Sequence, residues 1–66
     1  MERGKVKWFD EKKGFGFIEK QSGGDIFVHI SGFKDKDLKT LQQGASVEFE
    51  IGSGKKGPQA TNVVVV

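Results

Sequence analysis

Residue types that could carry catalysis are scarce in this chain. Its 66 residues include one histidine, His29, and no cysteine. The sequence therefore offers no recognisable nucleophile–base pair and no set of His and Cys ligands for zinc. The Gly14-Phe15-Gly16 stretch lacks the third glycine of a dinucleotide loop, and Phe49 stands where a phosphate-binding loop ending in Gly54-Lys55 needs its first glycine. We expect no enzyme activity, no cofactor, no small-molecule substrate and no metal site.

Aromatic residues, by contrast, follow a regular pattern. Phe15 and Phe17 alternate along one segment, and Phe27 and His29 alternate along another. Successive side chains of a strand point to opposite faces, so these four should point away from the aliphatic residues Ile18, Ile26 and Val28. The opposite orientation would expose those three aliphatic side chains together and bury the histidine. We expect an exposed aromatic patch, which soluble proteins rarely keep without a binding partner.

Lysines flank these aromatic residues, at Lys7, Lys13 and Lys56. Flat rings beside ammonium groups suit single-stranded nucleic acid, because unpaired bases stack on rings while lysines contact phosphates. A duplex hides its base faces, so such a patch selects accessible strands more than particular sequences. Trp8 and Phe9 are adjacent, and only one of them can join the patch in a regular strand. We expect Trp8 to point outward, and both to reach the patch only if a bulge or strand end intervenes.

The elements that position these residues read as strands. Period-two alternation predicts five strands, and glycine-rich turns separate most of them, at residues 5–10, 15–20, 26–30, 46–51 and 59–65. Residues 31–43 are polar and mixed, which predicts a long loop with at most one helical turn. An open sheet of this size would leave an apolar face and two edges exposed. The sequence therefore predicts an all-β fold, a small five-stranded antiparallel barrel.

Length and composition limit the architecture further. The chain allows one small domain, spanning residues 1–66, and without cysteine its hydrophobic core must stabilise it without disulfides. Inward positions by strand parity are Val6, Ile18, Ile26, Val28, Val47, Phe49 and Ile51.

The net charge and the terminal sequences indicate little about the binding partner. The net charge of +2 is too small to identify a partner. No apolar run has the length of a signal peptide or a membrane helix, so we expect a cytoplasmic protein that does not bind membranes. We expect a monomer, although four terminal valines, Val63 to Val66, leave strand pairing between chains open.

Two motifs give the sequence a family resemblance. Lys13-Gly14-Phe15-Gly16-Phe17-Ile18 is similar to the first ribonucleoprotein motif, and Ile26-Phe27-Val28-His29 is similar to the second. From Gly4-Lys5-Val6-Lys7-Trp8-Phe9 to Gly57-Pro58-Gln59-Ala60, the chain resembles the bacterial cold-shock proteins without an obvious gap.

This resemblance implies an OB-fold barrel that binds single-stranded RNA and single-stranded DNA, favours pyrimidines and acts as an RNA chaperone. From the absence of a phosphate-binding loop we expect the chaperone to work without ATP, and a role in regulating transcription or translation during cold adaptation would fit the family. The binding residues that it implies are Lys7, Trp8, Lys13, Phe15, Phe17, Phe27, His29 and Lys56, with Phe9 and Gln59 as secondary candidates.

The chain departs from the family pattern at three places. Ile30 stands where relatives commonly have an aromatic residue, and Leu38 where they have phenylalanine, so the stacking surface should be smaller. Phe33 either replaces a lost stacking ring or fills the core under the long loop, and we favour the core.

Three other binding modules share some of these features. An RRM domain shares the Gly-Phe-Gly-Phe signature but needs two helices, and Lys20 replaces one of its aromatic residues. Gly54-Lys55-Lys56-Gly57 fits the loop of a KH domain but has no helical flanks. A small barrel that binds proline-rich or apolar peptides stays the alternative, disfavoured because the chain has no tyrosine and surrounds its rings with lysines.

Overall fold

The computed structural model describes residues 1–35, 37–54 and 57–66, and strands dominate it. The elements are β1 (Glu2–Asp10), β2 (Phe15–Lys20), β3 (Asp25–His29), a 3₁₀ turn η1 (Ile30–Gly32), β4 (Ser46–Gly54) and β5 (Gly57–Val65). The all-β prediction is confirmed. The predicted bounds of β2 match, β1, β4 and β5 are longer than predicted, and Ile30 begins the 3₁₀ turn instead of ending β3.

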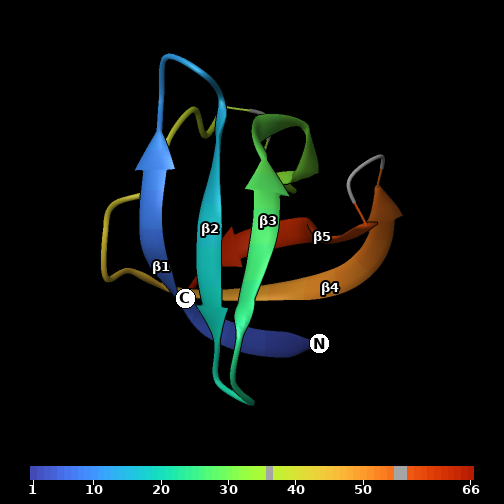
Figure 1. The fold of residues 1–66 in the computed structure, drawn as a ribbon. Helices are drawn as coiled ribbons and strands as arrows, with labels where there is room; N and C mark the ends of the chain where they lie inside the picture. The colour runs from blue at the N-terminus through green and yellow to red at the C-terminus, as the bar shows by residue number, and fades with distance from the viewer. Residues whose placement is uncertain (36, 55–56) are drawn as a thin grey trace.

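The strands close into a barrel in the order β1-β2-β3-β5-β4. In Figure 1, β1, β2 and β3 stand side by side, and β4 and β5 run across them. Neighbouring strands are antiparallel except β3 and β5, which are parallel. The predicted five-stranded barrel is confirmed, and its one parallel pair has a geometric reason. Strand directions cannot alternate all the way round a ring with an odd number of strands.

The barrel interior is aliphatic and aromatic. Its buried residues are Val6, Ile18, Ile26, Val28, Phe33, Leu41, Val47, Phe49, Ala60 and Val63. Six of the seven predicted core positions are among them, but Ile51 is 48% exposed. The pairing of β4 with β5 shifts between Glu48 and Glu50, but the extra residue lies in β5, so this bulge does not account for the exposure of Ile51.

A second irregularity bends β1. Its register with β2 shifts between Val6 and Trp8, which leaves Lys7 as the extra residue. Val6 is buried, whereas Lys7 and Trp8 are both exposed. The bulge therefore turns two consecutive side chains outward and returns Phe9 to the side of the core.

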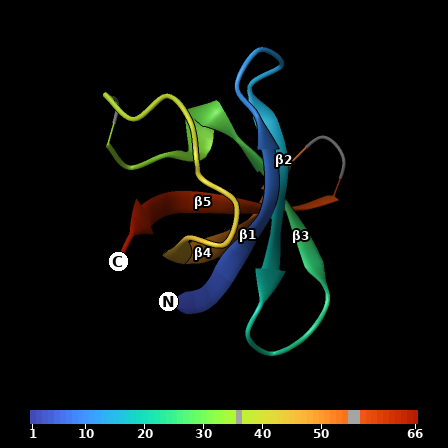
Figure 2. The ribbon, with the colours of Figure 1, turned by 90° about the vertical axis from the view of Figure 1, so that its left-hand side faces the viewer.

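The long connection after η1 covers one opening of the barrel. In Figure 2 it rises above β5 and then runs down past β5 and β1 to the start of β4. Phe33 and Leu41 from this connection are buried, which confirms the core assignment of Phe33. Phe33 forms a parallel bridge with Val63, and the backbone N–H of Lys34 donates to the Val63 carbonyl at 3.0 Å. The connection thus supplies core side chains that the strands lack.

Gly16 allows β1 and β2 to approach closely at the bulge. A Cβ atom at this position would overlap the Trp8 carbonyl oxygen and lie 2.7 Å from the Phe9 Cα. Any larger residue would push β1 away from β2 just where Trp8 is positioned.

Among the described residues, no helix has the length and apolar character needed to cross a membrane.

Candidate nucleic-acid interface

Four aromatic rings meet on the outer face of β1, β2 and β3. Trp8 contacts Phe15 and Phe17, with ring centroids 5.9 and 5.5 Å apart. Phe27 contacts the same two phenylalanines at 5.7 and 5.8 Å. These four residues, Trp8, Phe15, Phe17 and Phe27, form a continuous surface that we call the aromatic platform. Trp8 is 40% exposed and the three phenylalanines are half-buried, so the predicted outward orientation is confirmed.

Strand register explains why the rings meet. Trp8 pairs with Phe17, and Phe17 pairs with Phe27, so these three form one row across the sheet. Gln59 of β5 pairs with Phe27 and extends this row. Phe15 pairs with His29 in the neighbouring row. Without the bulge at Lys7, Trp8 would point to the other face, and the row would lack its largest ring.

His29 lies beside Phe15 and caps the 3₁₀ turn. Its Nδ1 accepts a hydrogen bond from the Ser31 backbone N–H at 3.1 Å and lies 2.9 Å from the Ser31 hydroxyl. A neutral ring that accepts at Nδ1 carries its proton on Nε2. The histidine therefore offers a hydrogen-bond donor at the other side of its ring.

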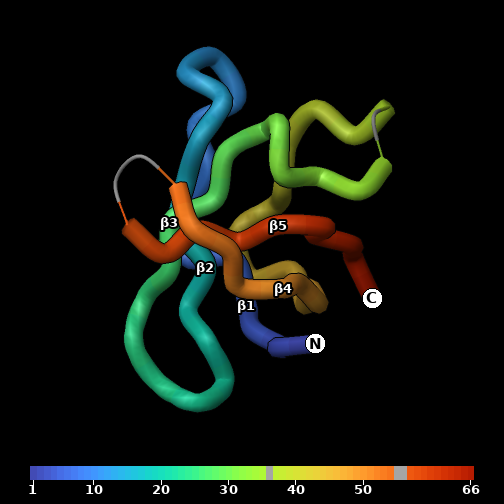
Figure 3. The backbone as a smooth tube through the Cα atoms, turned by 90° about the vertical axis from the view of Figure 1, so that its right-hand side faces the viewer, coloured from blue at the N-terminus to red at the C-terminus, as the bar shows by residue number. Residues whose placement is uncertain are grey.

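The turn between β1 and β2 carries Lys13. The Asp10 carboxylate accepts from the backbone N–H groups of Lys12 and Lys13 at 3.0 and 3.1 Å, and Gly14 follows with φ +76°. The Ile30 N–H donates to the Gly14 carbonyl at 2.8 Å, which fixes this turn to η1. Lys13 is exposed two residues before Phe15. In the tube drawing of Figure 3, the β1–β2 turn and the β2–β3 turn lie at opposite ends of the sheet.

Lys7 lies at the bulge beside Trp8, and its ammonium group already has a partner. Lys7 Nζ lies 2.8 Å from the Asp25 carboxylate at the start of β3. The hydrogen bond that Lys7 donates to this carboxylate, and then the charge of the carboxylate, raise the pKa of Lys7 above its usual value. No local sequence pattern indicates this pair, because the two residues are 18 positions apart and meet only through the bulge.

Two of the predicted binding residues, Phe9 and Gln59, are not among the four rings of the platform. The Phe9 ring lies on the side of the core and contacts Phe33, with centroids 5.4 Å apart, so the structure does not bring it to the four rings. Gln59 lies next to Phe27, and its amide fills the space that a side chain at Gly54 would occupy. Lys56 lies outside the described residues.

The two aliphatic departures from the family pattern pack inward. Ile30 and Leu38 are partly buried and pack against the core. Neither adds a ring to the platform.

Other kinds of site receive less support. Across the described ranges, no three His, Cys, Asp or Glu side chains are grouped to hold a metal ion. A cavity of about 420 Å³ lies away from the rings, beside Arg3, Lys5, Glu19 and Lys20. The outer face of β1, β2 and β3 is thus an aromatic surface with basic residues at its margins.

Comparison with known proteins identifies the family. The model of the "Cold-shock" DNA-binding domain matches residues 2–66. The chain belongs to the cold-shock domain family. A cold shock-like protein of Thermotoga maritima is 64% identical to this cold-shock domain, over 97% of each chain. Cold shock protein CspB of Bacillus caldolyticus is 55% identical, and CspD of Bacillus subtilis 53%, again over 97% of each chain. Membership agrees with the closed five-stranded barrel, and the description of the family makes nucleic acid the first ligand to consider for this cold-shock domain.

Proposed function

We propose that this cold-shock domain binds single-stranded RNA and DNA on the aromatic platform. The observation that carries this proposal is the contiguous set of four rings, held half-exposed on three strands. A soluble chain that leaves such a patch on its surface generally uses it to bind. Bases can stack on the rings, and the family description agrees with a nucleic-acid ligand.

The other predicted binding residues are assigned roles from their positions around the platform. Lys13 at one end of the platform, Lys7 at the other and Lys56, which lies outside the described residues, would contact phosphates. His29 would donate from Nε2 to a base or phosphate oxygen, and Gln59 would contact the base beside Phe27. Phe9 would act indirectly, by supporting β1 beneath Trp8.

We further propose that the domain acts as an RNA chaperone that does not need ATP. A protein that binds open strands but not duplex shifts the equilibrium toward the open state. At 100 times the dissociation constant this contributes about 2.7 kcal/mol, comparable to one or two base-pair steps. Only weak structures should open. A preference for pyrimidines, a regulatory role in cold adaptation, a cytoplasmic location and a monomeric state belong to the same proposal.

Oligothymidylate is expected to quench the fluorescence of Trp8 in a saturable way, because bases stacking on the platform contact the only tryptophan of the chain. The measurement is a titration with oligothymidylate, with the corresponding duplex and with a proline-rich peptide. Duplex and peptide should leave Trp8 unchanged. Saturable binding of the peptide, with none of the single strand, would instead favour the peptide-binding alternative.

A marginally stable RNA hairpin carrying a fluorophore and a quencher is expected to open when the protein is added without nucleotide. Opening should follow protein concentration by mass action. A hairpin with the same loop and several more base pairs is the matched control and should stay closed. Opening that required ATP, or equal opening of both hairpins, would contradict the trapping mechanism.

A further inference from the structure

Strand β4 is longer than the ladder that it forms with β1. β1 pairs with β4 only as far as Phe49, which lies opposite Glu2. Beyond Phe49, residues 50–54 pair only with β5 among the described residues. Lys55 and Lys56 follow this segment and lie outside the described residues. The side of residues 50–54 that faces away from β5 therefore has no partner strand, and we call it the free edge of β4.

Backbone polar groups point toward this free edge. The Thr61 hydroxyl donates to the Glu50 carbonyl at 3.3 Å, which places the backbone groups of Glu50 on the β5 side. Pro58 of β5, which has no N–H to donate, lies opposite Ser53. Because successive residues of a strand direct their N–H and C=O groups to opposite sides, Ile51 and Ser53 direct theirs to the free edge. An added strand would find two donors and two acceptors there.

One face of the free edge is apolar. By alternation, Ile51 points to the same side of β4 as the buried Val47 and Phe49. It lies beyond the last residue that pairs with β1, and it is 48% exposed. Met1, just before the Glu2 that ends this ladder, is 68% exposed. An aliphatic side chain of an added strand could pack beside Ile51.

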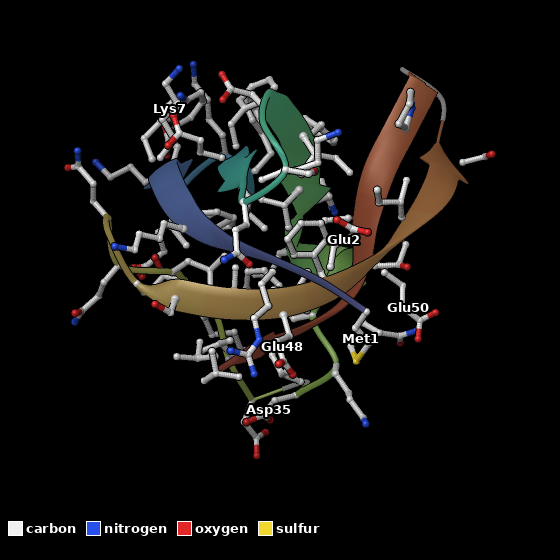
Figure 4. All side chains as sticks on the ribbon, turned by 90° about the horizontal axis from the view of Figure 1, so that it is seen from below. Met1, Glu2, Lys7, Asp35, Glu48 and Glu50 are labelled. Atoms are coloured by element: carbon white, nitrogen blue, oxygen red, sulfur yellow. The ribbon has the colours of Figure 1, made fainter. Side chains whose placement is uncertain are left out.

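The other face of the free edge is acidic. Glu48 and Glu50 share this face by alternation, and Glu50 is exposed. Arg3 pairs with Glu48 at 2.7 Å, whereas Glu2 and Glu50 form no ion pair with another described residue. Figure 4 shows Glu2, Glu48 and Glu50 on the side of the molecule away from Lys7. The free edge is therefore separate from the aromatic platform, and its charge repels nucleic acid.

We propose that the free edge of β4 binds an extended peptide of another protein in which basic and aliphatic residues alternate. The peptide would add a strand whose backbone bonds to Ile51 and Ser53. Its basic side chains would lie beside Glu50 and its aliphatic side chains beside Ile51. A second copy of this chain fits less well, because it would bring its own glutamates to the acidic face. The inference goes beyond the proposed function and does not depend on it.

A labelled synthetic peptide of alternating lysine and valine tests the site. Its fluorescence anisotropy should rise saturably as protein is added, and salt should weaken the binding. The same peptide with methylated backbone nitrogens cannot donate to the edge and should bind about tenfold more weakly or not at all. A peptide of alternating glutamate and valine should not bind.

Protein variants test the two faces of the edge. Glu50→Lys replaces an attraction by a repulsion, and Ile51→Lys puts a like charge in place of the apolar contact. Each should weaken binding of the lysine–valine peptide by about threefold to thirtyfold. Glu11→Lys is the matched control, because it makes the same change of charge at an exposed position beyond the other end of β1. It should have little effect, and urea unfolding checks that every variant is folded.

Hydrogen exchange locates the bound peptide on the protein. The amide hydrogens of Ile51 and Ser53 should exchange more slowly in the complex, because the added strand accepts from them. Those of Gly52 and Gly54 point toward β5 and should change little.

Slower exchange at Ile51 and Ser53, together with the loss of affinity in Glu50→Lys, would support the site. Equal binding of the methylated peptide, or equal losses in Glu11→Lys and Glu50→Lys, would show that net charge alone attracts the peptide, and the proposal would be wrong. It would also be wrong if these two amides were protected at high protein concentration without peptide, since a second copy would then occupy the edge. Failure of oligothymidylate to bind would refute the proposed function and leave this site standing.

Discussion

Replacing Phe17 with alanine is expected to weaken binding of single-stranded oligonucleotides by about 1–3 kcal/mol, which is about fivefold to 150-fold in the dissociation constant. Phe17, like Phe15, contacts both Trp8 and Phe27, so its loss removes one stacking surface and one of the two supports of the other rings. Because Phe17 is half-buried, the loss of folding free energy should stay below the 3–5 kcal/mol that is roughly typical of a buried phenylalanine. Phe15→Ala and Phe27→Ala should behave in the same way.

The measurement must not depend on Trp8, whose surroundings change in this variant. Anisotropy of a labelled oligonucleotide gives the affinity, and urea unfolding followed by circular dichroism gives the stability. Phe49→Ala is the matched control, since the same side chain is lost from a fully buried position of β4. If Phe17→Ala unfolded as readily as Phe49→Ala, the ring would be a core residue and the platform would be wrongly assigned.

Phe33→Ala is expected to reduce the free energy of unfolding by about 3–5 kcal/mol, which is comparable to the whole stability of many domains of this size. The Phe33 side chain is 1% exposed and contacts Phe9, and its backbone joins the long connection to β5. Its removal would leave a cavity between the barrel and the connection that covers it. Urea unfolding monitored by Trp8 fluorescence measures the loss.

Phe33→Leu serves as the companion variant, because it retains most of the apolar volume and should cost much less. A Phe33→Ala protein with wild-type unfolding and weakened binding would show that Phe33 is a stacking ring, the alternative that the sequence left open.

Period-two alternation was enough to predict the barrel and the outward rings. Phe15, Phe17 and Phe27 lie in strands without internal bulges, where each residue's face follows from its neighbours. Trp8 and Ile51 lie next to irregularities. For Trp8, the adjacent rings made the conflict visible and the outward prediction was correct. For Ile51, the predicted burial was wrong, although the extra residue of the nearby register shift lies in β5 and leaves the alternation of β4 intact.

The features that could not be predicted from the sequence depend on contacts between residues far apart in the chain. The contact between Lys7 and Asp25 depends on a bulge that brings a lysine over β3, and no local pattern encodes it. Leu41 sits in a polar stretch that reads as an exposed loop, yet the connection folds back and buries it. The residue types of the candidate site were predictable from the sequence, whereas the ion pair between Lys7 and Asp25 was not.

The parallel seam between β3 and β5 would link the proposed ligand binding to the stability of the barrel. Within the described part of the chain it is the shortest ladder of the five, pairing Phe27 with Gln59 and Val28 with Ala60. Short ladders open first in local unfolding. A base stacked on Phe27 and hydrogen-bonded to Gln59 would contact both strands of this seam from outside. An occupied platform would therefore hold β3 and β5 together. Amide hydrogens along β3 and β5 would then exchange more slowly in the complex than in the free protein. Bound nucleic acid would thus stabilise the barrel against local opening.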